Sequence, residues 1–213
     1  MARFAIVKNH LYLVDYASLK YFDIADALSP SYEGTIKIEE GIETVFSYGD
    51  RLFIGSMSGV HIFDIANPQS PQPISVYRHI VACDPVVVSG DYAYATLRSA
   101  GCRQWGADLL DVIDVSDISN PVNVKSLPMT GPYGLGVSDT LLFVCDGSRG
   151  LLVFNIKNPA DPVLFNQIDA VHGYDVIPLP ERKTIIVTGA KGIYQYDYSD
   201  PYHIQYLSAV HVE

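Results

Sequence analysis

One motif returns five times along the chain, and a repeat of this kind restricts the fold more than any local feature does. Each copy ends an apolar run with an acidic or amide residue and continues into a turn rich in Asn, Asp, Ser and Pro. The copies are LKYFDIADALSP from position 19, VHIFDIANPQSP from 60, LDVIDVSDISNP from 110, LLVFNIKNPADP from 151 and IYQYDYSDPYHI from 193. Their acidic or amide residues, here called the anchors, are Asp23, Asp64, Asp114, Asn155 and Asp197. The anchors are 41, 50, 41 and 42 residues apart, so one unit contains an insertion of about nine residues.

Within each unit, four short runs of β-forming residues alternate with turn residues. The second unit reads TVFSYG, RLFIGS, VHIFDIA and PISVYRH, with Gly-Asp, Ser-Gly and Asn-Pro at the junctions. Four strands in about 40 to 45 residues are typical of a propeller blade. The sequence therefore predicts an all-β fold, a β-propeller of five four-stranded blades of about 41–50 residues. The predicted domain is 1–213, with blades at approximately 2–40, 41–81, 82–130, 131–171 and 172–213.

Ring closure is a separate question. The chain begins with a predicted first strand and ends with a fourth, so no strand is left over to join the last blade to the first. Closure would rest on apolar packing between blades, or the seam would take up another segment. The structural alternative is an open β array cut from a larger propeller.

Charge and hydropathy exclude several classes of protein. The 213 residues include 24 Asp and Glu against 14 Lys and Arg, a formal net charge of −10. Lys and Arg do not cluster, which argues against nucleic acid as a partner. With 48% hydrophobic and 18% charged residues, the composition is not that of a disordered chain. No run reaches the roughly 18 apolar residues of a transmembrane segment, and Lys8 and Asp15 interrupt the region where a signal peptide needs an apolar core.

The repeat units resemble a known family. The FDI-x-[ND]-P units, together with DPVVVSGDYAYATLRS and LLFVCDGSRGLLVFNI, are similar to the LVIVD-repeat proteins over essentially the whole chain. The resemblance implies a β-propeller without an established activity. It also implies an extracytoplasmic location, periplasmic or at the cell surface, often as a lipoprotein. The lipidation signal and a further N-terminal region of such proteins are absent from this sequence, so we expect it to be the propeller portion, C-terminal in a longer precursor.

Antiparallel connectivity predicts where a site would form. The start of each first strand and the end of each second strand share one face of a blade, and first strands line the central channel. Polar residues at these positions therefore converge on one mouth of the channel, and their mixed charges suit a polar or cationic ligand. The alternative is that they are solvated loop residues. The candidates are Arg3, Glu43, Asp84, Arg98, Arg103, Trp105, Tyr133, His172, Tyr174 and Asp175.

The insertion of the third unit, SAGCRQWGAD, lies on the same predicted face and contains the only tryptophan, Trp105. Trp105 would serve either as an anchor for a protein or glycan partner or as a lid over the channel. Cys83 and Cys102 share this face, and a disulfide between them would pin the insertion in an oxidising compartment. The alternative is buried thiols, the state we expect for Cys145.

Motifs of catalysis and of cofactor binding are missing. The six histidines show no spacing that fixes a metal ion, so neither a metal nor a cofactor is predicted, and most histidines are expected at surface or strand positions. His172 is the exception, because it precedes Tyr174 and Asp175 at the predicted mouth. Nucleophile elbow, Walker and dinucleotide-binding motifs are also absent.

Three functions therefore stay open. The first is a non-enzymatic scaffold that presents one loop face to a protein, peptide or glycan. The second is a hydrolase or lyase whose acid or base is Asp84, His172 or Asp175. The third is that the five units complete a larger protein whose activity lies elsewhere.

Overall fold

The computed structural model describes residues 3–79, 85–99 and 107–212, and in these ranges the chain is almost entirely β-structure. Twenty strands form five antiparallel sheets of four strands each, and every sheet takes its strands in chain order from one stretch of the sequence. The first sheet contains β1 (Phe4–Val7), β2 (His10–Val14), β3 (Ser18–Asp23) and β4 (Ser31–Lys37). The second contains β5 (Ile42–Tyr48), β6 (Arg51–Ser56), β7 (Gly59–Asp64) and β8 (Gln72–Arg78). The third contains β9 (Val86–Ser89), β10 (Tyr92–Leu97), β11 (Leu109–Asp114) and β12 (Val122–Pro128). The fourth contains β13 (Pro132–Ser138), β14 (Leu141–Asp146), β15 (Leu151–Asn155) and β16 (Val163–Ile168). The fifth contains β17 (Gly173–Leu179), β18 (Thr184–Gly189), β19 (Gly192–Asp197) and β20 (Gln205–His211).

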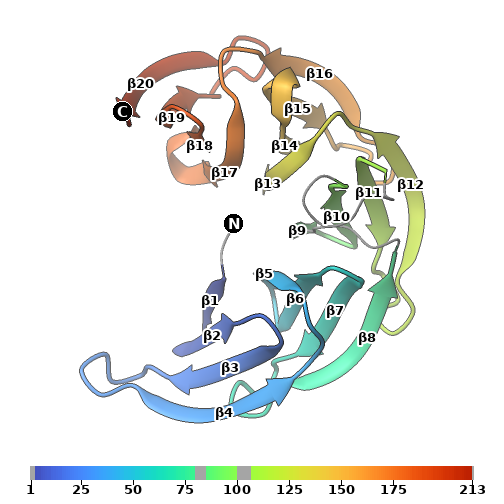
Figure 1. The fold of residues 1–213 in the computed structure, drawn as a ribbon, viewed down its shortest axis with the longest axis vertical. Coiled ribbons are helices and arrows are strands. Elements are labelled where there is room, and N and C mark those ends of the chain that lie inside the picture. Colours follow the sequence, from blue (N-terminus) through green and yellow to red (C-terminus); the bar gives the residue numbers. More distant parts are fainter. Residues whose placement is uncertain (1–2, 80–84, 100–106, 213) are drawn as a thin grey trace.

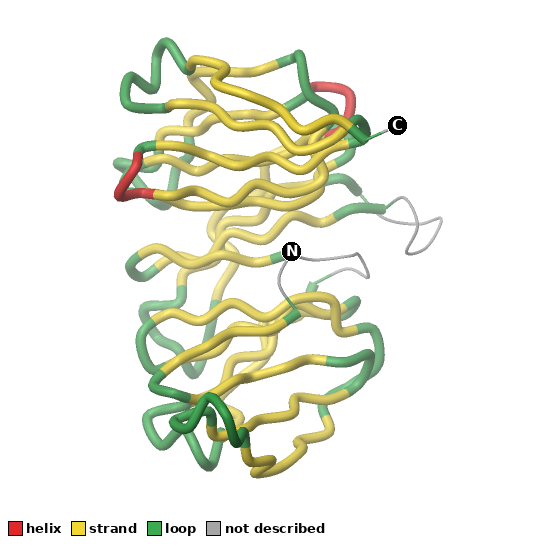
Figure 2. Tube along the Cα trace, turned by 90° about the vertical axis from the view of Figure 1, so that its left-hand side faces the viewer, coloured by secondary structure: helices red, strands yellow, loops and turns green. Residues whose placement is uncertain are grey.

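The five sheets are arranged around a central axis as the blades of a propeller (Figure 1), which confirms the predicted fold class. The first strand of each sheet lies nearest the axis and the fourth lies outermost. Seen from the side, the sheets lie in succession along the longest dimension of the molecule (Figure 2). Two single-turn 3₁₀-helices, Gly147–Arg149 and Pro180–Arg182, are the helices of the described ranges. Neither has the length or composition to cross a lipid bilayer.

The anchors have a local structural role at the end of each third strand. In every unit, the anchor's side-chain oxygen accepts a hydrogen bond from the backbone N–H two residues later, at 2.7–2.9 Å. This is an Asx turn, which only a short side chain with a carbonyl or carboxylate oxygen can make. The turn starts the connection to the fourth strand, and it explains why Asp and Asn recur at these five positions.

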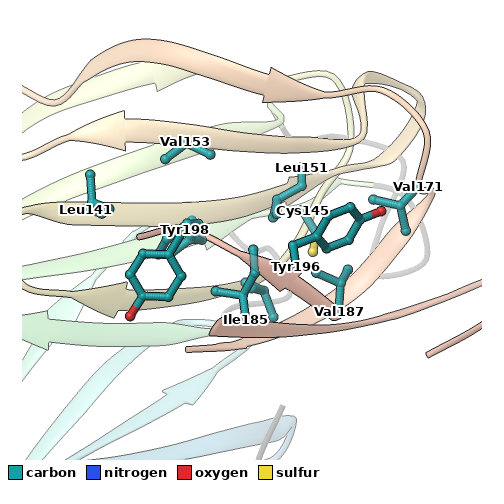
Figure 3. Packing of buried hydrophobic residues seen from close by; sticks show 11 residues of the cluster. Leu141, Cys145, Leu151, Val153, Val171, Ile185, Val187, Tyr196 and Tyr198 are labelled. Carbon is teal, nitrogen blue, oxygen red and sulfur yellow. The ribbon is translucent and has the colours of Figure 1, made fainter. Parts of the chain in front are cut away.

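The apolar core is divided into four layers, one between each pair of successive sheets. Figure 3 shows the layer between the fourth and fifth sheets, where Cys145 and Leu151 of the fourth face Val187 and Tyr196 of the fifth. Hydrogen bonds also join neighbouring sheets: the hydroxyls of Tyr12 and Tyr94 each donate to a carbonyl of the Asn-Pro turn in another sheet, at 3.0 Å. Sheets therefore adhere through packed side chains and through the turn that the repeat encodes.

No fifth layer joins the last sheet to the first among the described residues. The two end sheets lie apart in Figure 1, and their outward faces carry exposed apolar side chains. In the first sheet these include Phe4 and Ile6, and in the fifth Ile193 and Val210. The propeller is therefore open at one seam.

Candidate functional site

The first strands of four sheets enclose a central cavity of about 300 Å³. The face of the molecule where first strands begin and second strands end is here called the mouth face. Its lining is mostly apolar, and Thr44 and Asp175 are its side chains with oxygen atoms. The other lining residues are Val45, Phe46, Pro85, Val86, Val87, Leu135, Gly136, Val137, Val176, Ile177 and Pro178. An apolar cavity with a few polar groups in its lining is the usual form of a small-ligand site.

Three aromatic side chains gather at the mouth where the fourth and fifth sheets meet. The rings of Tyr133 and Tyr174 have centroids 5.4 Å apart, and that of His172 lies 6.1 Å from Tyr133 and 5.6 Å from Tyr174. The guanidinium carbon of Arg98 lies 4.5 Å from the centroid of the Tyr133 ring, within cation–π range. Four of the predicted residues, from three sheets, therefore form one cluster, here called the aromatic cluster: Arg98, Tyr133, His172 and Tyr174.

The local sequence explains how Tyr133 and Tyr174 come together. Gly134 follows Tyr133 in β13, and a Cβ atom on it would collide with the carboxylate of Asp175. The absence of a side chain at Gly134 therefore lets β17 approach β13 closely. The carbonyl of Tyr133 is held from the other side, because it accepts a hydrogen bond of 2.7 Å from the hydroxyl of Thr96.

Two acidic residues lie near the cluster. Burial raises the pKa of Glu43, and the positive charges of Arg98 and Arg3 only partly oppose this effect. Asp175 accepts a hydrogen bond from the backbone N–H of Val176 at 3.0 Å. Burial, together with the charge of Asp175, raises the pKa of Cys145, so this free thiol stays protonated at neutral pH. Cys145 is therefore a buried apolar residue, as expected.

The other predicted site residues lie outside the described ranges. These are Asp84, Arg103, Trp105 and the two cysteines of the expected disulfide, Cys83 and Cys102. Arg3 is described and exposed, close enough to Glu43 for its charge to act on that carboxyl. The residues that the structure brings together are thus Arg3, Glu43, Arg98, Tyr133, His172, Tyr174 and Asp175.

Sequence reasoning missed two polar clusters in the first two units. In one, Glu39 accepts hydrogen bonds from Ser56 at 2.8 Å, from His61 at 2.7 Å and from Ser58. In the other, the imidazole of His10 lies beside the carboxylates of Asp23 and Glu33. The available signal was strand pairing: His10 begins a second strand and therefore lies opposite the anchor Asp23.

Comparison with known proteins supports the repeat and the fold. The LVIVD repeat matches residues 82–127 and 134–170, the third and fourth units, which confirms the resemblance to LVIVD-repeat proteins. Curated protein sequences provide no significant match.

Many solved structures share the fold at low sequence identity. A protein of unknown function from Desulfotomaculum acetoxidans has a TM-score of 0.79 at 10% identity, covering 99% of this chain and 69% of its own. A Lactobacillus plantarum protein has a TM-score of 0.78 at 15% identity, covering 96% of this chain and 69% of its own. The periplasmic gluconolactonase of Pseudomonas aeruginosa has a TM-score of 0.75 at 13% identity, covering 96% of this chain and 68% of its own. These similarities establish the fold alone.

Proposed function

We propose that this chain, a propeller that carries LVIVD repeats, is a non-enzymatic scaffold whose mouth face binds a protein, peptide or glycan. The observation that carries the proposal is the aromatic cluster. Arg98 and Tyr133 are partly buried, and Tyr174 is 43% exposed, so the cluster is accessible to a ligand.

The composition of this cluster suits recognition. Tyr and Arg are enriched among the residues that dominate binding energy at protein interfaces. A tyrosine offers a large contact area with only two side-chain torsions, so little conformational entropy is lost on binding. Contacts among the three rings and the guanidinium hold them in place before a ligand arrives, which lowers the entropic cost further.

The test uses a double substitution, Tyr133→Ala with Tyr174→Ala. We expect it to weaken partner binding at least 10-fold while far-UV circular dichroism stays unchanged, since about 2 kcal/mol is typical for a dominant contact residue. Binding would be measured by affinity capture from the native source and on a glycan array. The matched control is Tyr48→Ala, because Tyr48 is also 43% exposed but lies at the opposite end of its blade. Equal loss in the control, or no loss in the double variant, would contradict the proposal.

A second candidate function is an enzyme with an acid at the mouth. The observation that favours it is Glu43, whose raised pKa suits a proton donor and which directly precedes the cavity-lining Thr44 in the chain. A protein of similar fold is named a gluconolactonase, so gluconolactone hydrolysis is the first reaction to assay. Turnover that disappears in Glu43→Gln would favour this candidate over the scaffold. Hydrolysis at the uncatalysed rate would exclude the reaction.

A further inference from the structure

A histidine and two carboxylates meet in the first sheet, at the end opposite to the mouth face. His10 is the first residue of β2, Asp23 ends β3, and Glu33 lies in β4. One ligand atom from each residue lies within 4.8 Å of the other two. We propose that these three residues bind a divalent transition-metal ion, specifically Zn²⁺.

The orientation of His10 is the first argument. Its Nδ1 lies 2.9 Å from the carbonyl oxygen of Lys8, and because a carbonyl only accepts, Nδ1 carries the proton. In the neutral form of the ring, this tautomer presents the Nε2 lone pair to the cluster. Ligating histidines are commonly oriented by such a bond from the other ring nitrogen.

The second argument is that the facing atoms are buried without a hydrogen bond. His10 is 7% exposed, and neither its Nε2 nor Oε2 of Glu33 has a hydrogen-bond partner among the described residues. Yet these two atoms lie only 3.2 Å apart. Buried polar atoms nearly always have partners. Two atoms that bind the same zinc ion lie at a similar separation. Zn–N and Zn–O bonds of about 2.1 Å place tetrahedral ligand atoms roughly 3.4 Å apart, close to the 3.2 Å between Nε2 and Oε2.

The third argument comes from the other four units, where the matching positions do not form this cluster. The residues opposite the anchors are Arg51, Tyr92, Leu141 and Thr184. Glu33 occupies a β-bulge of the fourth strand, and its counterparts are the apolar residues Ile74, Val124, Phe165 and Leu207. A propeller sheet of this repeat therefore forms without His10 and Glu33. The first unit alone has His10 and Glu33 at these positions, and their side chains meet in one cluster with Asp23.

The ligand chemistry selects the metal. One imidazole and two carboxylates carry two negative charges, which a divalent cation neutralises. A nitrogen ligand favours Zn²⁺ over Mg²⁺ and Ca²⁺, which prefer oxygen ligands in larger number. The hydroxyl of the nearby Tyr12 donates a hydrogen bond to the carbonyl oxygen of Pro68 at 3.0 Å, so this phenol has a partner elsewhere and is not counted among the ligands. Three protein ligands leave a fourth position for water or an external ligand.

The experiment is a calorimetric titration of the chelator-treated chain with ZnCl₂. We expect one equivalent of Zn²⁺ to bind, and at least a 10-fold loss of affinity in each of three variants: His10→Gln, Asp23→Asn and Glu33→Gln. Asp23→Asn keeps the Asx turn, because Asn155 makes the same turn in the fourth unit. A loss of affinity in this variant is therefore not a loss of folding, which circular dichroism would verify for all three.

The matched control is His61→Gln. His61 is equally buried and also faces a glutamate, but its Nε2 is hydrogen-bonded to Glu39 at 2.7 Å. Zn²⁺ binding should be unchanged in this variant. The proposal is overturned if the wild-type chain binds no Zn²⁺, which would leave a plain His10–Glu33 ion pair. It is also overturned if the three cluster variants bind as the wild type does, or if Ca²⁺ binds more tightly than Zn²⁺.

Discussion

At the scale of single residues, Gly150 determines the turn that leads into the third strand of the fourth sheet. Its φ is +78°, a conformation that L side chains rarely adopt. A Cβ atom there would also collide with the carbonyl oxygen of Ile168 in the neighbouring strand. Gly49, in a different turn, has a φ of +55° but open space where its Cβ would be. Substitutions at these two glycines therefore distinguish the cost of backbone strain from the cost of steric overlap.

We predict that Gly150→Ala destabilises the protein by at least about 2 kcal/mol, because strain and collision act together. Gly49→Ala should cost about 1 kcal/mol, since only the left-handed conformation is penalised. Urea unfolding followed by circular dichroism measures both. Equal costs for the two variants would show that the overlap with Ile168 relaxes freely.

Single residues also mark the limit of prediction from sequence. Tyr133, His172 and Tyr174 could be placed on one face because antiparallel strands alternate direction, and this needs no coordinates. The group formed by His10 and Glu33 could not be predicted in this way. Glu33 faces His10 only because a β-bulge shifts the register of its strand, and the position of a bulge is set by three-dimensional packing rather than by residue type.

At the scale of structural elements, the connection between the first and second sheets is held by Glu39. Burial raises the pKa of this carboxyl, but the hydrogen bonds from Ser58, His61 and Ser56 outweigh burial and lower the pKa to about 2. The ordinary value of such a group is 4.5. Ionised Glu39 therefore stabilises the folded state above about pH 4.5, and this contribution disappears as the pH falls toward 2.

We predict that Glu39→Gln lowers stability at pH 6 by an amount on the order of 2 kcal/mol and removes part of the acid sensitivity. The difference in unfolding free energy between wild type and variant should shrink as the pH falls from 4.5 to 2.5. Urea titrations at several pH values measure it. Glu40→Gln changes the adjacent exposed glutamate and serves as the control. A difference that stays constant with pH would contradict the role given to Glu39.

The strands themselves were predictable, because turn residues separate β-forming runs in every unit. Their environments were predictable only in part. Continuous apolar runs suggested third strands covered on both faces, and β7, β11 and β15 are nearly fully buried. In contrast, β3 and β19 are partly exposed, because each belongs to a sheet with only one neighbour. A repeat in the sequence does not reveal which of its copies lies at an end.

At the scale of the whole molecule, the open seam exposes two apolar sheet faces. Ile6 is 60% exposed on the first sheet and Val210 is 68% exposed on the fifth. Five anchors sufficed to predict five sheets. Whether five sheets close a ring depends on the angle between neighbouring sheets, which many small packing contacts determine together. The sequence therefore left closure open, and the structure shows an open arc.

We predict that the isolated chain self-associates through these end faces, because contiguous exposed apolar surface favours association. Light scattering after size exclusion should give a mass above that of the monomer at micromolar concentrations. The double variant Ile6→Thr with Val210→Thr should return the chain to a monomer, since Thr keeps the β-propensity of the replaced residues. A monomeric wild type would contradict this prediction.

The division of the core into four separate layers has a consequence for how the molecule unfolds. A middle sheet must lose two layers to detach, whereas an end sheet must lose only one. Stability in such a linear array is a sum of nearest-neighbour terms rather than one cooperative quantity. We therefore expect the arc to unfold from its end sheets inward. The sheets that carry the aromatic cluster then differ in their protection from unfolding, because β10 and β13 lie inside the array and β17 lies at its end.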